Sequence, residues 1–262
     1  MKAILKTLSV AMGLVLLMPG ISGRAQVYAD SSIQLDKYLV PVTTPTATPD
    51  AQGFLGRWLL LEPISKPNRS NTVFIDSYIR EVFAVEYFKG QLGNELPKDG
   101  DKIKVTVEYQ PPVNLQGGRP MGFGMEPPKY EQKKVTLKWH AMDSKLPNVK
   151  LFRFATNLTE DRYGVIFWTV TVINCEEDIE NVRLAVGSNK AARWWVNGEE
   201  VLLLAGDRHM GVDSAVSDRV TLKKGRNVLR GVTMNGPGMS EFCARFIDDT
   251  GKPVTGYTIT CN

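Results

Sequence analysis

The chain has 262 residues, of which 43% are hydrophobic and 23% charged, enough for one large β domain or two small ones. This ordinary balance supports a sizeable core and argues against a chain that is disordered throughout. Only two histidines occur, His140 and His209, which argues against a histidine-rich metal site.

The first 25 residues show the pattern of a secretory signal peptide. Lys2 and Lys6 precede an apolar run at residues 8–18, which is shorter than the ~20 residues of a membrane-spanning helix. Cleavage is expected before Gln26 or, alternatively, before Asp30, and an uncleaved N-terminal anchor is the other interpretation. We therefore expect a periplasmic or extracellular protein with no transmembrane segment after processing.

Removal of this leader changes the charge argument. The leader holds three basic residues, Lys2, Lys6 and Arg24, and no acidic residue, so the formal charge falls from +4 to +1. A nearly neutral mature chain has no strong electrostatic attraction to nucleic acid, which we exclude as a partner.

Residues 26–53 are expected to form a linker. The run at residues 41–49 is rich in proline and threonine, favours extended backbone and has no core of its own. The folded domain is then expected to span residues 54–262.

One short helix is expected near the start of this domain. Asp76 is a candidate N-cap, and Ile79, Val82 and Phe83 recur at helical spacing on one stripe. Gly90 would end the helix.

The rest of the pattern is typical of short strands. Ile103, Val105 and Val107 alternate with polar residues, the period of a half-buried strand. Residues 111–128, rich in glycine and proline, are predicted to form a long surface loop. Strands are predicted at residues 57–62, 103–109, 135–139, 150–154, 165–173, 182–186, 193–196, 200–204, 219–222, 227–233 and 242–247. This succession predicts an all-β protein, a sandwich or a barrel.

Two turns carry strong local signals. Asn197-Gly198 lies between two predicted strands and favours the positive φ angles of a type I′ hairpin turn. Gly225 lies in another connection, where it is free to adopt the left-handed conformation.

An ordered set of motifs resembles a known family. After strands at residues 58–61, 163–168 and 182–189 come the hairpin Trp195-Val196-Asn197-Gly198 and the run Leu222-Lys223-Lys224-Gly225-Arg226-Asn227. This order resembles the galactose-binding-like jelly rolls attached to many bacterial carbohydrate-active enzymes. The resemblance covers about residues 54–250 and implies a jelly-roll β-sandwich that binds carbohydrate.

The resemblance also has departures. Family members often carry a structural calcium ion, but no calcium ligands can be matched in this sequence. The loop at residues 111–128 has no counterpart in the family pattern. A looser likeness is to acetylxylan-esterase-associated proteins of gut Bacteroidetes.

Trp194 is the first candidate ligand-binding residue. Neighbouring residues of a strand face opposite sides, and the resemblance places Trp195 in the core, so Trp194 is expected to be exposed and to stack on a sugar ring. Arg193 and Asn189 would supply hydrogen bonds to sugar hydroxyls. The alternative is that Trp194 packs under the helix or another loop.

The polar run at residues 207–214 is the second candidate. It lies between two predicted strands, and end loops of this kind commonly contact ligands. Asp207, Arg208 and His209 are the predicted contacts. Asp, His and Ser crowded into one loop rarely converge as a catalytic triad, and a solvated loop is the alternative.

Motifs of common enzyme classes are absent. The sequence has no nucleophile elbow, no phosphate-binding loop, no dinucleotide fingerprint and no zinc-protease helix. The three cysteines, Cys175, Cys243 and Cys261, allow one disulfide or three reduced thiols.

The sequence therefore predicts an exported, non-catalytic carbohydrate-binding or accessory module for polysaccharide degradation. Its expected partners are a polysaccharide or oligosaccharide and a carbohydrate-active enzyme, and no catalytic cofactor is expected. The alternatives are a carbohydrate esterase or glycosidase, and an envelope protein that binds a partner protein through the sandwich face.

Overall fold

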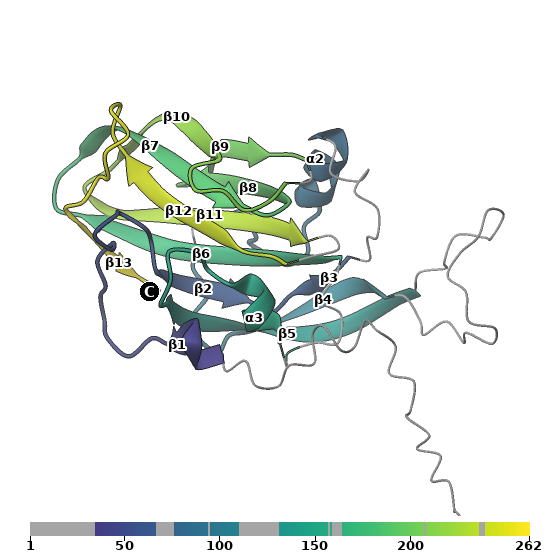
Figure 1. Ribbon diagram of the computed structural model, residues 1–262. Helices are drawn as coiled ribbons and strands as arrows, with labels where there is room; N and C mark the ends of the chain where they lie inside the picture. Colours follow the sequence, from purple (N-terminus) through teal and green to yellow (C-terminus); the bar gives the residue numbers. More distant parts are fainter. Residues whose placement is uncertain are drawn as a thin grey trace, which may run out of the picture. The chain divides into compact units, whose positions relative to one another are not determined.

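Two antiparallel β-sheets, one of ten strands and one of three, form the described part of the chain (Figure 1). The structure is a computed structural model and describes residues 35–66, 76–93, 95–109, 131–156, 158, 164–206, 208–235 and 239–262. The chain is therefore all-β in this part, with short helices at its periphery, as the sequence predicts. The predicted loop at residues 111–128 and the predicted leader lie outside the described residues.

The large sheet has the strand order β1-β5-β2-β6-β11-β8-β9, with β3 and β13 also paired to β6 and β4 paired to β5. Its strands are β1 (Leu39–Pro41), β2 (Arg57–Leu61), β3 (Ile64–Ser65), β4 (Lys102–Tyr109), β5 (Glu131–Ser144), β6 (Val165–Cys175), β8 (Ala191–Val196), β9 (Glu199–Leu204), β11 (Gly225–Asn235) and β13 (Tyr257–Thr260). The small sheet has the order β10-β7-β12 and consists of β7 (Ile179–Ser188), β10 (Ala215–Leu222) and β12 (Phe242–Ile247).

Both faces of the large sheet are covered. One face packs against the small sheet and forms the first core, which includes Trp58, Trp194 and Phe242. The opposite face packs against helix α2 (Asp76–Ala84) and forms the second core with Trp168 and Trp195, to which Val105 and Val107 of β4 also contribute. All residues of β2 and all but one of β6 are therefore buried, since neither strand has a face in contact with solvent.

The predicted helix and turns are confirmed. Helix α2 begins at Asp76 with Ile79, Val82 and Phe83 buried, although it ends at Ala84 rather than at Gly90. Asn197 and Gly198 have φ angles of 52° and 86°, the signs that a type I′ turn requires, and they join β8 to β9. Gly225 has a φ of 85°, in the left-handed region.

The predicted strand at residues 150–154 is wrong. Helix α3 (Leu151–Ala155) occupies this place, with Leu151, Phe154 and Ala155 buried. These three residues have the i, i+3, i+4 spacing of a helix face, and a short apolar run does not distinguish a helix from a buried strand. In the described residues, no helix has the length and apolar composition needed to cross a membrane.

The segment at residues 35–53 is folded onto the domain. A short 3-10 helix (Leu35–Lys37) precedes β1, which pairs with β5, and Leu39 is 1% exposed. Farther along, Ala47 pairs with Ile259. The sequence assigned residues 26–53 to a linker, whereas residues 35–53 of that range are part of the sandwich, because their sparse apolar side chains and backbone groups find partners far along the chain.

The three cysteines are all described and are unpaired. Cys175 and Cys243 are buried and Cys261 is partly buried. Burial raises the pKa of the Cys243 thiol to about 11 and that of the Cys261 thiol to about 12. Both thiols are therefore protonated, poor nucleophiles in the folded protein near neutral pH.

These raised pKa values predict a loss of stability at alkaline pH. Above about pH 9 the thiols ionise in the unfolded chain but stay protonated in the folded one, so the unfolded state binds fewer protons. The contribution of these thiols to the free energy of unfolding should be constant below about pH 9 and fall between there and about pH 11–12, by up to about 1.4 kcal/mol per pH unit for each thiol. Urea unfolding across this range measures the fall, and Cys243→Ala should make it shallower. Thiolate absorbance of the folded protein with a midpoint near the ordinary thiol pKa would contradict this prediction.

Candidate functional site

Trp194 is buried, contrary to its predicted role as an exposed sugar-stacking residue. Its exposed fraction is 0%, and its ring lies in the first core, 5.9 Å from the Trp58 ring and 5.2 Å from the Phe242 ring between centroids. The rule that neighbouring strand residues face opposite sides holds for Trp194 and Trp195. The prediction failed because Trp194 faces the small sheet across the first core, while the second core buries Trp195 on the other face, so that both sides of β8 are interior.

Trp195 occupies the second core and holds Arg193 in place. The Trp195 ring stacks on Trp168 at 5.7 Å, and the Arg193 guanidinium carbon lies 5.0 Å from the Trp195 centroid. Arg193 also donates a hydrogen bond to Glu200 on β9. Arg193 therefore belongs to an ion-pair arrangement at the sheet edge, not to a site beside Trp194.

The other predicted contacts lie at one end of the sandwich. The backbone amide of Asn189 donates to the backbone carbonyl of Glu241 (3.1 Å), and the backbone amide of Lys190 donates to that of Arg208 (3.3 Å). Asn189 is 9% exposed, whereas His209 is exposed. The backbone thus brings Asn189 and Arg208 to the same end, as expected of end loops, while Asp207 lies outside the described residues.

The loop at residues 208–214 does not assemble a triad among its described residues. Asp213 pairs with Arg245 on β12, and the Ser214 hydroxyl donates to the Gly211 carbonyl at 2.8 Å. The loop lies directly on β7, because a Cβ on Gly187 would stand 1.9 Å from the Gly211 carbonyl oxygen. Asp213 therefore fixes the loop to the small sheet, and the Ser214 hydroxyl stabilises a turn within the loop.

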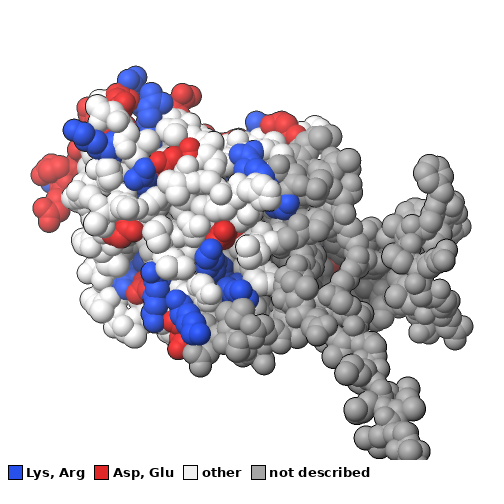
Figure 2. Space-filling view, viewed as in Figure 1, with Lys and Arg blue, Asp and Glu red and all other residues white. Residues whose placement is uncertain are grey.

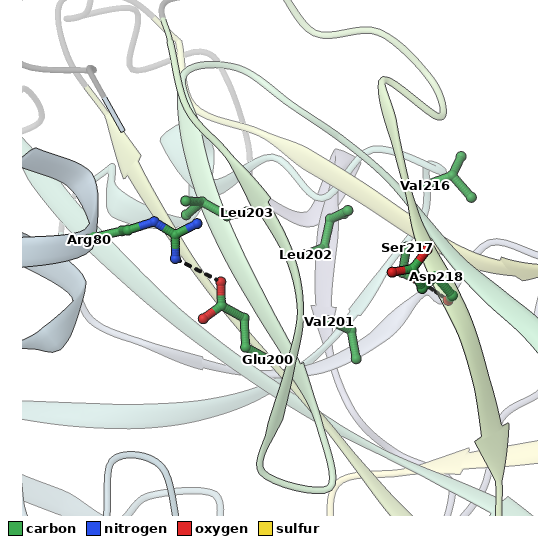
Figure 3. A pocket seen from close by; sticks show the side chains of 8 residues that line it. All are labelled: Arg80, Glu200, Val201, Leu202, Leu203, Val216, Ser217 and Asp218. Atoms are coloured by element: carbon green, nitrogen blue, oxygen red, sulfur yellow. Dashed lines mark hydrogen bonds and ion pairs between the residues drawn. The ribbon is translucent and has the colours of Figure 1, made fainter. Parts of the chain in front are cut away.

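A groove that sequence reasoning missed lies between the two sheets and α2 (Figure 3). It has a volume of about 490 Å³ and is open to solvent. None of the five predicted contacts that the structure describes lines it. Its lining residues are Arg80, Glu200, Val201, Leu202, Leu203, Val216, Ser217 and Asp218.

Two edge strands form the walls of this groove. Among the described strands, β9 pairs only with β8, and β10 pairs only with β7. Each edge strand carries a bulge. In β9, Trp194 pairs with Leu202 and Trp195 with Glu200, which leaves Val201 between them unpaired. A β-bulge bends an edge strand and re-aims its side chains, and such bulges are common beside functional sites.

The bulge in β10 places Ser217 and Asp218 differently. The Ser217 side chain is buried and accepts a hydrogen bond from the Leu184 amide at 2.9 Å, while Asp218 is exposed. The Ser217 hydroxyl thus accepts a hydrogen bond from the Leu184 amide at the point where the bulge interrupts the regular strand pairing. Asp218 keeps its carboxylate available to a ligand.

The opposite wall carries a linked set of charges. Arg80 on α2 donates to Asp76 at 2.8 Å and to Glu200 at 3.3 Å, as Figure 3 shows for the second contact. The hydrogen bond to Asp76 is the main cause that raises the pKa of Arg80. Glu200 accepts from both Arg80 and Arg193, so a single carboxylate joins the helix to the edge of the sheet.

Charges of both signs are mixed over the described part of the face in Figure 2, with uncharged surface between them. In the described residues, no group of three or more His, Cys, Asp or Glu side chains could hold a metal ion. The structure accordingly assigns no ligands to the calcium ion that the resemblance implies.

Comparisons with known proteins place the chain in no family. No protein-family model and no curated protein matches it. A PA14 sugar-binding domain from an RTX adhesin is 14% identical over 41% of this chain and 63% of that chain, with a TM-score of 0.28. The match thus spans less than two thirds of that domain.

Two further solved structures show similar values. The PA14 domain of the MpAFP antifreeze protein is 11% identical over 84% of this chain and 96% of that chain, with a TM-score of 0.35. A β-glucosidase from Kluyveromyces marxianus is 18% identical over 55% of this chain and 16% of that chain, with a TM-score of 0.31. Scores this low do not establish a shared fold, so the galactose-binding-like resemblance and the likeness to Bacteroidetes proteins stay predictions.

Proposed function

We propose that this protein is an exported, non-catalytic carbohydrate-binding module, and that the groove between β9, β10 and α2 binds a section of a glycan chain. The observation that carries this proposal is the composition of the groove. Planar charged groups of Arg80, Glu200 and Asp218 line the same open hollow as the aliphatic side chains of Leu202 and Val216.

This composition matches the two surfaces of a sugar. Hydroxyl groups both donate and accept hydrogen bonds, and bonds from hydroxyls to charged groups are worth roughly 1.5–3 kcal/mol. The C–H faces of the ring are apolar and fit against aliphatic side chains. No aromatic residue in the described part of the chain lines the groove, so we expect weak binding that depends mainly on hydrogen bonds.

Two features favour a glycan over a protein strand as the ligand. A strand that adds to a sheet edge needs a regular row of free N–H and C=O groups. The bulge at Val201 and the bulge at Ser217–Asp218 interrupt that row on both walls. The groove therefore offers side chains, not a continuous backbone template.

The groove also bears on the glycosidase alternative. Glycoside hydrolysis needs two carboxyl groups, one of which donates a proton. Glu200 and Asp218 share the groove, but both carboxylate oxygens of Glu200 already accept hydrogen bonds from guanidinium groups, those of Arg80 and Arg193. This arrangement favours binding over general acid catalysis.

Export and a role in polysaccharide degradation are parts of the same proposal. The signal-peptide pattern of the first 25 residues supports export. A nearly neutral mature chain with a mixed surface charge suits a neutral polymer better than an anionic one.

Affinity electrophoresis in gels that contain soluble xylan, mannan or β-glucan tests the groove. We expect at least one glycan to retard the wild-type protein, and Asp218→Ala or Arg80→Ala to weaken binding about tenfold, since each removes charged hydrogen-bonding groups. The exposed residues Asp36 and Lys89, which do not line the groove, supply the matched controls Asp36→Ala and Lys89→Ala.

Three results would overturn the proposal. They are retardation by no glycan, equal retardation of the groove variants and the wild type, and release of reducing sugar or acetate by the wild-type protein. The last result would support the glycosidase or the esterase alternative.

A further inference from the structure

A second hollow lies at a different place in the sandwich and shares no lining residue with the groove. It has a volume of about 210 Å³ and lies between the segment at residues 47–57 and the segment at residues 143–147. We propose that this pocket binds a single neutral polyhydroxylated ring, such as the terminal unit of a glycan or a free monosaccharide. This inference goes beyond the proposed function and does not depend on the groove.

A partly buried ion pair lies at the pocket. Arg57 is 1% exposed, and its Nε and Nη2 atoms each donate to Asp143 at 2.7 Å. Its Nη1 donates to the Thr44 carbonyl and its Nη2 to the Thr44 hydroxyl, both at 2.8 Å. These bonds join β2, β5 and the N-terminal segment, so this side of the pocket is pre-organised. The carboxylate of Asp143 is 30% exposed and can accept further hydrogen bonds.

The charges around the pocket balance. Among the described residues, two cationic side chains, Arg57 and Lys145, and two anionic side chains, Asp50 and Asp143, line it. One carboxylate oxygen of Asp50 already accepts from the amides of Gln52 (2.8 Å) and Phe54 (2.9 Å), which fixes its orientation. The site has no net charge and offers both hydrogen-bond donors and hydrogen-bond acceptors. It therefore suits a neutral ligand whose groups both donate and accept hydrogen bonds, as hydroxyl groups do.

The size and the remaining lining indicate one ring. Pockets for drug-sized ligands enclose about 300–1,000 Å³, so a volume of about 210 Å³ suits a smaller molecule. Ala47, Leu146 and Pro147 add apolar surface, against which the C–H groups of a sugar ring can lie. A ligand here would contact both segments and hold the N-terminal segment to the domain.

Titration with D-xylose, D-glucose and D-galactose, followed by saturation-transfer NMR and by thermal unfolding, tests this pocket. We expect at least one sugar to bind in the millimolar range and to raise the unfolding temperature through its preference for the folded state. Leu146 is 39% exposed, so Leu146→Trp should fill the pocket without disturbing the core and weaken binding at least about tenfold.

Matched variants separate the pocket from general effects and from the groove. Leu92, 45% exposed, does not line the pocket, and Leu92→Trp should bind the sugar like wild type. Asp50→Asn keeps the oxygen that accepts the two amide bonds but removes one charge, and it should weaken binding severalfold. Asp218→Ala in the groove should leave this binding unchanged, so that failure of one site is distinguishable from failure of the other.

The proposal is overturned if none of the three sugars binds, or if Leu146→Trp binds as the wild type does. It is also overturned if acetate or ethylamine, used as singly charged probes, displaces the bound sugar at equal concentration, because the pocket would then recognise charge.

Discussion

Gly231→Ala should strongly destabilise the sandwich, with a loss of about 3 kcal/mol in the free energy of unfolding. Gly231 lies in β11 opposite Trp194 of β8, and a Cβ there would stand 2.5 Å from the indole ring of Trp194. The ring cannot move aside, because Trp58 and Phe242 pack against it on other sides. Closely packed interiors respond to added volume with strain in side chains and backbone.

A double-mutant cycle isolates this cause. In a Trp194→Phe background the smaller ring leaves room for a methyl group, so Gly231→Ala should cost much less there than in the wild type, with a coupling of about 1–2 kcal/mol. Urea unfolding of the four proteins provides the measurement. Additive losses would show that the cost of the substitution lies in the strand backbone and not in the contact with Trp194.

Arg230→Ala should destabilise the protein by about 2–4 kcal/mol and loosen the segment that follows α2. The Arg230 side chain is buried, and its Nη2 donates to the carbonyls of Gly93 (2.8 Å) and Glu95 (3.2 Å). Without it, two carbonyls lose their donor and the second core gains a cavity. Burial lowers the pKa of Arg230 to about 10, so removal of a poorly solvated charge offsets part of the loss.

Hydrogen exchange distinguishes this role from a general effect on folding. Amide protection in residues 85–98 should fall more in Arg230→Ala than protection in the small sheet. Arg226, exposed on the same strand, gives the control Arg226→Ala, for which we expect a change within about 0.5 kcal/mol. An equal loss of protection in both sheets would refute the local role.

The candidate site shows where sequence reasoning stopped. Trp194 and Trp195 were correctly assigned to opposite faces of the strand. Whether either side chain reaches solvent, however, depends on what packs against that face of the sheet. The groove could not be read from the sequence, because its walls come from α2, β9 and β10, which are separated along the chain. The bulges that shape the groove depend on the register of strand pairing, and no single residue type predicts them.

The sequence by itself determined most of the local structure. Alternating apolar residues, the Asn197-Gly198 turn and the left-handed Gly225 arise from short-range sterics and side-chain periodicity, so neighbouring residues suffice to predict them. The identity of residues 150–154 was open at that level, because a short apolar run fits a helix or a strand equally well. Only the tertiary structure decided that both faces of the large sheet are buried, that residues 39–47 join the sandwich and that ligand-sized hollows lie between its edges. Those features arise from contacts between segments that are far apart in the sequence. A local sequence pattern carries no information about the free energy of such contacts.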